Sequence, residues 1–473
     1  MNVDLGTLDR TLLDLARRID RGVRDAGGRA LLVGGSVRDA LLRRPVVDLD
    51  IEVFGIEPRP LRALLEQEWR VEEVGESFAV LKLRHHAIDV SLPRRERKTG
   101  ARHRDFEVAA DPSMSIAEAA RRRDFTINAM SIDLATGELE DPFGGRGDLE
   151  RRLLRHTSER FVEDPLRVLR GMQLVARFEL DAAPETVELC RSVPFEGLAP
   201  ERVFDEWRKL LLKGVRISRG LAFLRDTEWV RYFPELRDLI DCPQDPQWHP
   251  EGDVWTHTLH VMDAFARERV NDLWEDLVVG LACLCHDFGK PGTTTRENGR
   301  IRSLGHESAG EPPTRSFLER MTRQSALMDE VVPLVRHHLK PRQLFDAKAS
   351  DAAVRRLADR VGRIDRLARV ARADAGGRPP LPPDDEAASW ILERARSLEL
   401  ADHRPTALVL GRHLIERGLQ PGPEFGPILD RCFEAQLDGA FTSLEGGLDY
   451  LDRLLRDGPA PVPVEIKVRP GSS

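Results

Sequence analysis

The sequence contains no apolar run near the length that crosses a membrane, although the chain has 473 residues. Residues 1–20, MNVDLGTLDRTLLDLARRID, form an amphipathic pattern with acidic side chains and are therefore unlike a secretory signal peptide. Aromatic residues are scarce at 6% of the chain, whereas charged residues make up 32%. These features argue against a membrane protein and predict a soluble protein of the cytoplasm.

Cysteine is also scarce. The five cysteines show no paired spacing, which fits a reducing compartment better than a disulfide framework. Cys283 and Cys285 fall in an apolar stretch and are interpreted as buried small hydrophobic residues. The chain also lacks internal repeats and is too long for one ordinary core, so we expect several domains.

The chain has no overall excess of positive charge, since its net charge is −8. This negative charge disfavours indiscriminate binding to nucleic acid. Basic residues nevertheless gather at 94–104 (RRERKTGARHR), with six Lys and Arg against one Glu, and again at 121–123. Such a patch suits docking of a defined RNA through its phosphates, although a solvated charged surface has the same pattern. Four residues are candidate RNA contacts: Arg94, Arg95, Arg97 and Lys98.

The pattern of apolar residues changes near residue 148. From there on it is helical almost throughout, whereas the region before it mixes strands and helices around a loop rich in Arg, Lys and Gly. We therefore predict an α+β protein with a small sheet-containing head and a long helical body. Its head is expected to contain strands at 29–33, 46–54, 70–74, 78–84 and 87–92, helices at 37–43 and 115–131, and a hairpin around Thr136 and Gly137.

Two carboxylates, Asp48 and Asp50, follow a glycine turn in residues 34–39 (GGSVRD). On a strand, side chains two residues apart point to the same face, so a cation must neutralise the pair, and carboxylate oxygens suit Mg²⁺. The glycines let backbone N–H groups approach an anion, and Arg38 can reach a phosphate. The stretch predicts a metal-dependent site for a nucleoside triphosphate. Asp89, on a later strand, is either a third carboxylate or a strand-end cap.

Three further strings follow in the chain: RRDFTINA at 122–129, DPFGG at 141–145 and EDPLRVLR at 163–170. The last is expected to open a helix, with acidic residues in the first turn complementing the helix dipole. Asp164 and Arg167 are three residues apart, so we expect them to share a helix face. An acceptor beside a forked donor suits recognition of one planar base.

In this order the strings resemble the class II CCA-adding enzymes, the tRNA nucleotidyltransferase and poly(A) polymerase family within the DNA polymerase β-like superfamily. The resemblance runs from about residue 30 to 240, and further strings extend it almost to the C-terminus. It implies a polymerase β-like head with a small mixed sheet, followed by a helical neck, body and tail. Residues 94–106 resemble a loop that is absent or shortened in relatives that add only CC.

The resemblance also implies roles for the matching positions. Asp48 and Asp50 would hold catalytic Mg²⁺, and the protein itself would act as the template by offering hydrogen bonds that a wrong base leaves unmade. The remaining positions would bind the nucleotide: Gly35 and Arg38 its phosphates; Arg122 or Arg123, with Asp124 and Asn128, its ribose; and Asp164 and Arg167, supported by Arg170, its base.

A second constellation lies in the helical body, where His257, the pair His286–Asp287, and Asp374 occur in the order of an HD-type phosphohydrolase domain. Imidazole and carboxylate are ligands for a divalent transition metal such as Ni²⁺ or Mn²⁺ and can activate water. The resemblance implies phosphodiesterase and phosphatase activity towards 2′,3′-cyclic and 2′-phosphates. Other histidines could replace His257, add ligands for a second ion or contact a phosphate: His260, His306, His337 and His338.

From the resemblance we expect four parts: a nucleotidyltransferase head at 1–150, a helical neck at 151–240, an HD domain at 241–378 and a tRNA-binding helical tail at 379–473. The tail includes a PGPEFG turn at 421–426. Its partners would be tRNA, CTP and ATP, with no membrane. The sequence does not distinguish a monomer from a homodimer.

The leading interpretation is therefore a CCA-adding enzyme with a second, HD phosphohydrolase activity. An A-adding enzyme of the same family is the nearest alternative. A poly(A) polymerase usually has a strongly basic C-terminus, which this chain lacks. An HD phosphohydrolase or RNA-binding protein with an inactive head belongs to a different class. Intact Asp48, Asp50, Asp164 and Arg167 argue against that class.

Overall fold

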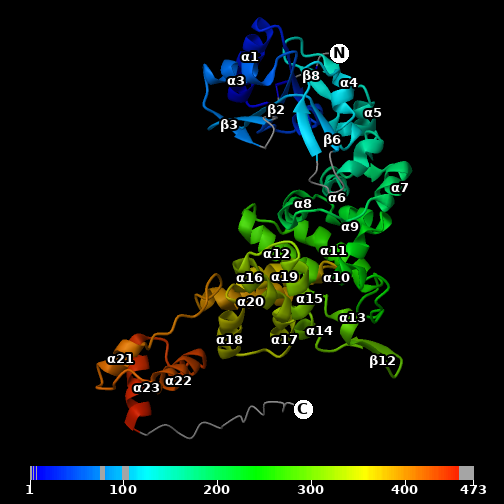
Figure 1. Ribbon diagram of the computed structural model, residues 1–473. Helices are drawn as coiled ribbons and strands as arrows, with labels where there is room; N and C mark the ends of the chain where they lie inside the picture. The colour runs from blue at the N-terminus through cyan, green and yellow to red at the C-terminus, as the bar shows by residue number, and fades with distance from the viewer. Residues whose placement is uncertain (1–2, 4, 7, 75–79, 99–105, 457–473) are drawn as a thin grey trace, which may run out of the picture. The chain divides into compact units, whose positions relative to one another are not determined.

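The computed structural model describes residue 3 and residues 5–6, 8–74, 80–98 and 106–456 (Figure 1). The chain divides into two compact units, Met1–Arg237 with Arg320–Thr322, and Asp238–Glu319 with Arg323–Ser473. Within the described residues, no helix combines the length and the apolar character needed to cross a membrane. All five cysteines lie in the described residues, and all are unpaired and buried.

The first unit begins with a seven-stranded sheet in the order β3-β4-β5-β2-β1-β8-β9. The sheet is mixed, because β2 pairs in parallel with β5 and the other neighbours are antiparallel. Apolar residues of β1, β2 and α4 pack together beneath it. Its strands are β1 (Arg29–Val33), β2 (Leu49–Phe54), β3 (Val71–Val74), β4 (Val80–Leu83), β5 (Ile88–Ser91), β8 (Ser131–Asp133) and β9 (Leu139–Glu140).

Helix α1 shows how the sequence sets these elements. The carboxylate of Asp9 accepts the N–H groups of Thr11 and Leu12 and so caps the helix, while Ile19 and Val23 are fully buried on its inner face. The helices of this unit are α1 (Arg10–Asp25), α2 (Gly35–Leu41), α3 (Pro58–Glu66), α4 (Ile116–Ala120), α5 (Gly145–Glu150), α6 (Leu166–Phe178), α7 (Pro184–Ser192), α8 (Pro200–Lys213), α9 (Ile217–Asp226) and α10 (Pro234–Arg237).

Short elements complete the first unit. Strand β6 (Arg94–Lys98) pairs antiparallel with β7 (Phe106–Ala110), so the stretch expected to be a loop contains a two-stranded ribbon. Strand β10 (Leu153–Leu154) pairs in parallel with β11 (Asp181–Ala182). The 3₁₀ turns are η1 (Thr126–Asn128), η2 (Glu159–Glu163) and η3 (Trp229–Tyr232).

The helix expected over residues 115–131 is wrong. Helix α4 ends at Ala120, the chain then turns through η1, and β8 begins at Ser131. The carboxylate of Asp124 accepts the N–H of Phe125 and a side-chain N–H of Asn128, and such local bonds compete with a continuous helix. Asp164 likewise lies before α6, in an extended conformation, rather than inside the helix.

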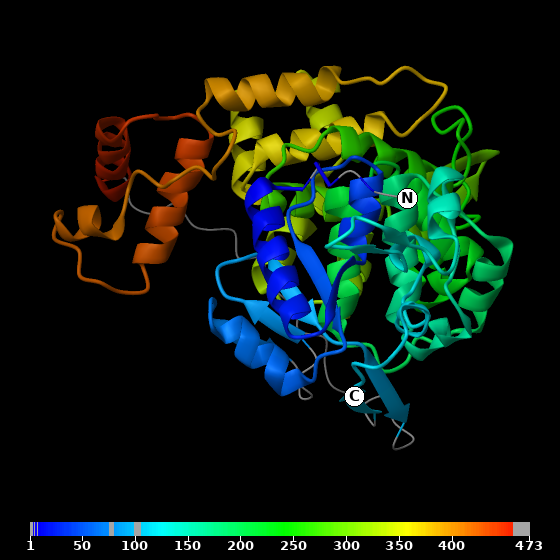
Figure 2. The ribbon, with the colours of Figure 1, turned by 90° about the horizontal axis from the view of Figure 1, so that it is seen from above.

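Over the described part of the second unit, the regular elements are helices apart from one hairpin, β12 (Thr294–Glu297) and β13 (Arg300–Ser303). Helix α20 follows the proline-rich residues 379–383 and packs against α17, α18 and α19, so the bundle continues beyond that stretch (Figure 2). The helices are α11 (Val254–Arg267), α12 (Leu273–Cys285), α13 (Lys290–Thr293), α14 (His306–Ala309), α15 (Glu311–Glu319), α16 (Ser325–His337), α17 (Lys340–Asp346), α18 (Asp351–Val361), α19 (Ile364–Ala375), α20 (Glu386–Ser397), α21 (Gly411–Ile415), α22 (Phe425–Leu437) and α23 (Leu444–Arg456).

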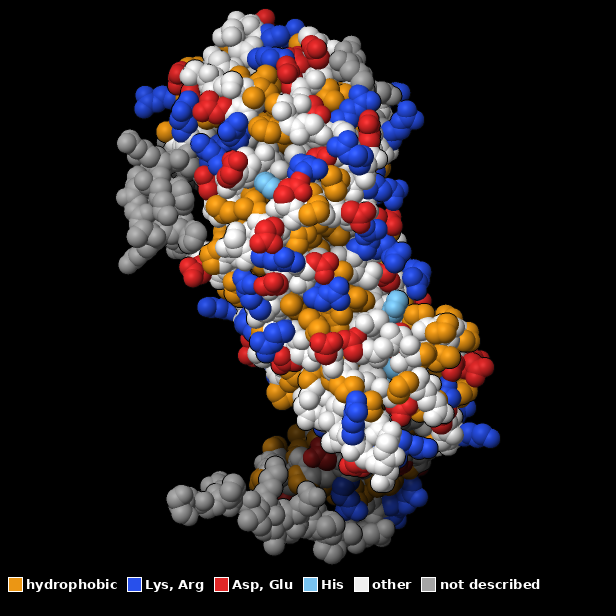
Figure 3. All heavy atoms as spheres, turned by 90° about the vertical axis from the view of Figure 1, so that its right-hand side faces the viewer, with side chains coloured by type: hydrophobic (Ala, Val, Ile, Leu, Met, Phe, Trp, Pro, Cys, Tyr) orange, Lys and Arg blue, Asp and Glu red, His pale blue; other side chains and the backbone are white. Residues whose placement is uncertain are grey.

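One face of the surface mixes charges of both signs. On the face shown in Figure 3, acidic and basic side chains are interspersed rather than gathered into one large area of a single sign. This face therefore presents no large area of one sign of the kind that attracts a polyanion.

Candidate active sites

An acidic pocket lies at one end of the head sheet. Asp48 immediately precedes β2, Asp50 is its second residue, and Asp50 is in register with Asp89 on the parallel neighbour β5. This register favours Asp89 as a third carboxylate beside the predicted pair. Lys82 Nζ lies 2.9 Å from a carboxylate oxygen of Asp89. The pocket has a volume of about 470 Å³ and is lined by Asp48, Leu49, Asp50, Glu72, Lys82, Leu83, Arg84, His85, His86, Ala87 and Asp89.

Negative charge accumulates in this pocket. Desolvation, followed by the neighbouring carboxylates of Asp48 and Asp89, raises the pKa of Asp50. Arg123 and Lys82 oppose the rise, although Arg123 is itself bonded to the carboxylate of Glu52 at 2.9 Å and Lys82 to that of Asp89. Three carboxylates in one pocket offer the oxygen ligands that hard cations such as Mg²⁺ prefer.

Gly34 lets the turn before α2 pass beside these charges. Its φ of +74° lies in the left-handed region that favours glycine. A Cβ atom there would lie 3.5 Å from both a guanidinium nitrogen of Arg123 and a carboxylate oxygen of Asp50. The glycine turn thus keeps the chain close to the acidic pocket, as the motif predicted.

A buried network of hydrogen bonds joins four of the predicted nucleotide-binding residues. Arg38 donates to the side-chain oxygen of Asn128 at 2.6 Å, Asn128 donates to Asp124 at 3.0 Å, and Arg170 donates to Asp124 at 2.9 Å. Burial alone would raise the pKa of Asp124. Arg170 and the hydrogen bonds from Asn128 and from the N–H of Phe125 lower this pKa. The network fixes α2, η1 and α6 to one another.

Arg38 is held by further contacts besides this network. Its side chain is buried, its guanidinium stacks over the Phe178 ring at 4.3 Å from the centroid, and it also bonds Asp39. The phosphate contact expected of Arg38 therefore stays a prediction, while its contacts make it an organiser of the site. Sequence reasoning missed Glu206, a buried carboxylate with an oxygen 3.8 Å from Arg170.

Of the residues expected to read the base, Arg167 lines a second pocket of the head and neck, with a volume of about 250 Å³, whereas Asp164 and Arg170 are not among its lining residues. Arg167 donates to the backbone carbonyls of Arg160 and Arg122 at 2.7 and 2.6 Å. Asp164 accepts the N–H of Leu166 and the guanidinium of Arg202. The pocket is lined by Glu52, Val80, Ser91, Leu92, Arg94, Ala119, Arg122, Arg123 and Arg167.

The candidate RNA contacts belong to strand β6. Arg94 lines the second pocket, and its carbonyl accepts a hydrogen bond from Arg122. Arg95 pairs with the carboxylates of Asp111 and Glu118. The side chains of Arg97 and Lys98 lie outside the described residues, so their contact with RNA stays a prediction.

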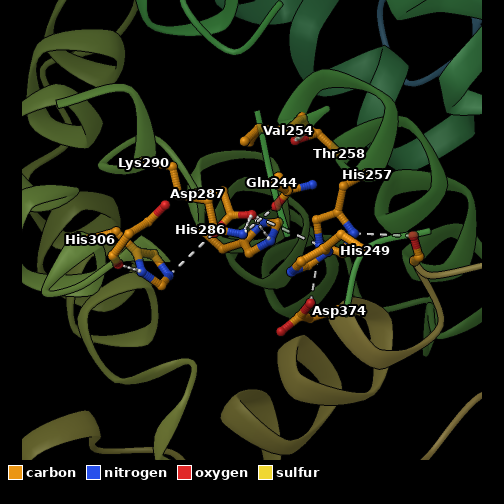
Figure 4. A network of polar contacts seen from close by, with 12 residues as sticks. Gln244, His249, Val254, His257, Thr258, His286, Asp287, Lys290, His306 and Asp374 are labelled. Carbon is orange, nitrogen blue, oxygen red and sulfur yellow. Dashed lines mark hydrogen bonds and ion pairs between the residues drawn. The ribbon is translucent and has the colours of Figure 1, made fainter. Parts of the chain in front are cut away.

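The HD residues meet inside the second unit (Figure 4). His257 comes from α11, His286 and Asp287 from the end of α12, and Asp374 from α19. His257 Nε2 lies 3.1 Å from a carboxylate oxygen of Asp374, and His286 Nε2 lies 3.2 Å from Asp287. Three groups in the described residues bring metal-ligand atoms within 4.8 Å of one another: His257, His286 and Asp374; Asp287, His306 and His338; and His249, Glu251 and His257.

Asp287 connects the first two groups, because one of its oxygens lies 3.2 Å from His286 and the other 3.4 Å from His306. The four predicted ligands thus divide between two adjacent clusters. His306 and His338 join the second cluster, and their binding of a second ion or of a phosphate stays a prediction. His337 and His260 belong to none of these groups in the described residues.

Hydrogen bonds set the tautomers of the histidines. The Nδ1 atoms of His286, His306 and His338 each lie 2.7 Å from a backbone carbonyl. Each Nδ1–H therefore donates to that carbonyl, which turns the lone pair of Nε2 towards the cluster. The Nε2 atoms of His306 and His338 face each other at 3.3 Å. Burial, and then His286 and His306, lower the pKa of His338 to about 3, so its imidazole is neutral and its Nε2 is free to accept.

Lys290 Nζ lies 2.7 Å from one carboxylate oxygen of Asp287, but His286 Nε2 and the other Asp287 oxygen are buried acceptors with no hydrogen-bond donor. Buried polar atoms without partners are costly, and a divalent ion would satisfy these at once. Gly289 permits the geometry, because a Cβ atom there would lie 2.0 Å from the carbonyl oxygen of His306. The residues present fit a metal centre.

Sequence reasoning gave Glu251 no role. Its side chain is fully buried, and one carboxylate oxygen accepts from Nδ1 of His257 and of His249, each at 2.8 Å. A carboxylate bonded to the far nitrogen of a histidine holds the ring and strengthens the ligand atom. The WHPEGD string at 248–253 carried the signal, but only the fold brings Glu251 behind His257.

Replacing Glu251 by glutamine is expected to weaken Mn²⁺ or Ni²⁺ binding to the second unit by about 10- to 100-fold, because the amide keeps the size and loses the charge that orients His257. Calorimetric titration of the chelator-treated full-length protein measures this change. The matched control is Glu393→Gln, at an exposed position of α20. Equal affinities for the two variants would show that Glu251 has only a packing role.

Comparisons with known proteins agree with this geometry. Residues 30–155 match the model of the poly A polymerase head domain, and residues 254–403 match that of the HD domain. The chain is 37% identical to the multifunctional CCA protein of Xanthomonas campestris, over 84% of this chain and 95% of that protein. It is 38% identical to the multifunctional CCA protein of Stenotrophomonas maltophilia, over 85% and 97% of the two chains.

Solved structures share the fold. The Bacillus stearothermophilus CCA-adding enzyme in complex with CTP aligns with a TM-score of 0.65 at 23% identity, over 95% of this chain and 99% of that one. The Thermotoga maritima CCA-adding enzyme complexed with tRNA aligns with a TM-score of 0.58 at 19% identity, over 94% and 96%. The expected α+β architecture, a sheet-containing head before a helical body, is confirmed.

Proposed function

The chain belongs to the multifunctional CCA protein family, and from that premise we propose that it adds CMP, CMP and AMP to the 3′ end of tRNA from CTP and ATP without a nucleic-acid template. The observation that carries the proposal is the pocket shared by Asp48, Asp50 and Asp89, close to the glycine turn. A carboxylate cluster beside a phosphate-binding turn suits nucleotidyl transfer.

The reaction joins the terminal ribose hydroxyl of the RNA to the α-phosphorus of the nucleotide. The hydroxyl oxygen forms the new bond, the bond from the α-phosphorus to the bridging oxygen breaks, and pyrophosphate leaves. Asp48 and Asp50, with Asp89, would hold divalent ions, which lower the pKa of the hydroxyl and neutralise the triphosphate. The chain contributes by positioning: Gly34 and Gly35 bring backbone N–H groups to the phosphates.

Base selection is assigned to Asp164 and Arg167, with Arg170 as their support. Arg170 is anchored by the buried Asp124, and both carbonyl contacts of Arg167 hold its guanidinium in one orientation. A donor and an acceptor fixed in this way favour a base with the complementary edge. Arg122 and Arg123 line the same pocket as Arg167 and are proposed to contact the ribose.

A division of labour along the chain follows from these sites. We assign nucleotidyl transfer to residues 1–150, base selection to the neck at 151–240, metal-dependent hydrolysis to 241–378, and tRNA binding to the tail at 379–473 together with Arg94, Arg95, Arg97 and Lys98. We place the enzyme in the cytoplasm, because its five cysteines are unpaired.

For the HD site we propose hydrolysis of 2′,3′-cyclic phosphates and 2′-phosphates at damaged tRNA ends. Both domain types use divalent metal ions, and Mn²⁺ or Ni²⁺ suits the imidazole-rich clusters of His257, His286 and Asp374, and of Asp287, His306 and His338. Water would bond to phosphorus, one phosphorus–oxygen bond to the ribose would break, and the released ribose oxygen would take a proton.

The addition reaction is tested with three tRNA transcripts that end at the discriminator base, after the first C, and after the second C. Each transcript receives CTP, ATP or both. Complete CCA on the shortest transcript is the expected result. Addition of A only to the CC-ending transcript would assign the chain to the A-adding enzymes, and a homopolymer on unrelated RNA would assign it to the poly(A) polymerases.

A further inference from the structure

The HD pocket extends beyond the metal-ligand clusters to an exposed aromatic side chain. It has a volume of about 230 Å³, and its lining includes Asp287, His306, His338 and Asp374 as well as Trp248. Trp248 is 63% exposed, and it is the only one of the seven tryptophans, all of them described, that is exposed. An indole in water beside a polar pocket offers a large apolar face to a ligand.

The turn that carries Trp248 is held from both sides. The carbonyl of Asp245 accepts the N–H groups of Trp248 at 3.1 Å and His249 at 2.9 Å, and its carboxylate accepts the N–H of Gln247 at 3.0 Å. His249 is in turn bonded to the buried carboxylate of Glu251 at 2.8 Å. These bonds hold the backbone that carries the indole, so little backbone freedom is lost when a ligand stacks on the ring.

Two cations line the same pocket. Lys290 Nζ donates to Gln244 and lies beside Asp287, each at 2.7 Å, and a guanidinium nitrogen of Arg378 lies 2.9 Å from Asp374. Cations beside the ligand carboxylates attract the oxygens of a phosphate. The charged end of the pocket therefore suits an anionic group, and its aromatic end suits a flat ring.

We propose that Trp248 is a base platform for the HD site. Its indole stacks on the terminal nucleobase of an RNA 3′ end, while Lys290, Arg378 and the ligand clusters hold the 2′,3′-cyclic phosphate or 2′-phosphate of the same nucleoside. Every base has a π face, so the platform accepts any terminal base and disfavours phosphate esters that carry no base. This inference rests on the proposed phosphohydrolase function.

The test compares the full-length protein with its Trp248→Ala and Trp248→Phe variants in Mn²⁺. The substrates are 2′,3′-cyclic AMP and glycerol 1,2-cyclic phosphate, which presents the same five-membered ring without a base. Trp248→Ala is expected to lower the preference for 2′,3′-cyclic AMP, as a ratio of kcat/KM values, by about tenfold through its KM. Trp248→Phe is expected to restore most of the preference.

Binding supplies a second measurement that needs no turnover. Calorimetry is expected to show that Trp248→Ala binds adenosine 2′-monophosphate with an affinity about tenfold lower than the wild type. Its affinity for glycerol 2-phosphate is expected to be unchanged. Leu273→Ala, at a 67% exposed leucine of the same unit, is the control. Equal losses for both ligands would overturn the platform and leave the phosphohydrolase intact. A wild-type protein that neither hydrolyses nor binds any of these phosphates would overturn both proposals.

Discussion

Replacing Asp50 by asparagine is expected to lower the rate of nucleotide addition to tRNA by about a thousandfold or more, while hydrolysis of 2′,3′-cyclic AMP continues at the wild-type rate. The reason is charge. Asp50 lies in register with Asp89 and in one pocket with Asp48, and asparagine removes one of the three charges that would hold the divalent ions. Single-turnover extension of a CC-ending transcript with ATP measures the effect.

Asp25→Asn is the matched control, because Asp25 is an exposed carboxylate at the end of α1 in the same unit. It is expected to extend the transcript as the wild type does. The Asp50 variant should keep its thermal stability, since removal of one of several crowded negative charges relieves repulsion. Near-normal addition by this variant would contradict the assignment of the acidic pocket as the polymerising site.

The second large effect is expected at the HD site. Replacing His286 by alanine should lower hydrolysis of 2′,3′-cyclic AMP by about a thousandfold and leave CCA addition unchanged. Nε2 of His286 faces Asp287 and accepts no hydrogen bond. The Nδ1–H of the same ring donates to the carbonyl of Cys283. Alanine removes this ligand atom. Initial rates with saturating Mn²⁺ measure hydrolysis, and calorimetry measures metal binding.

His286 is buried, so its replacement by alanine leaves a cavity. Asp287→Asn serves as a second variant, because asparagine has nearly the same volume as aspartate. Both variants should bind Mn²⁺ more weakly, by about 10-fold or more. His403→Gln, at an exposed histidine of the same unit, is the control. Loss of addition together with hydrolysis, in a protein that still unfolds at the wild-type temperature, would contradict the separation into two sites.

Local spacing pointed to the acidic pair and the HD pair, because both depend on neighbours in the chain. The expected strand over 46–54 was to carry both aspartates, but β2 begins at Leu49, so Asp50 lies on the strand and Asp48 directly precedes it; the HD pair follows an apolar helix, as expected. The place of Asp89 depends on the parallel pairing of β2 with β5. That pairing is non-local, so the sequence left Asp89 open between two roles.

The failed prediction of a helix over 115–131 has the same origin. Residues 116–120 (IAEAA) have a strong helical preference and do form α4. Beyond them, Asp124 bonds Arg170, which is 46 residues away, and Asn128 bonds Arg38, which is 90 residues away. These distant partners hold the chain in a turn against its local preference. Glu251 was missed for the same reason, because its role depends on the hydrogen bonds that it accepts from His249 and His257 in the folded chain.

The burial of every cysteine has a practical consequence for experiments in solution. Burial raises the pKa of the Cys190 thiol to about 12, and it raises the pKa values of Cys242, Cys283 and Cys432 as well. The thiolate is the form that attacks a thiol reagent, so the buried cysteines of the native protein should react slowly. A single cysteine introduced at an exposed position in each unit can therefore carry a fluorophore without removal of the native five. Such a labelled pair measures, by energy transfer, the distance between the labels of the two units with and without tRNA.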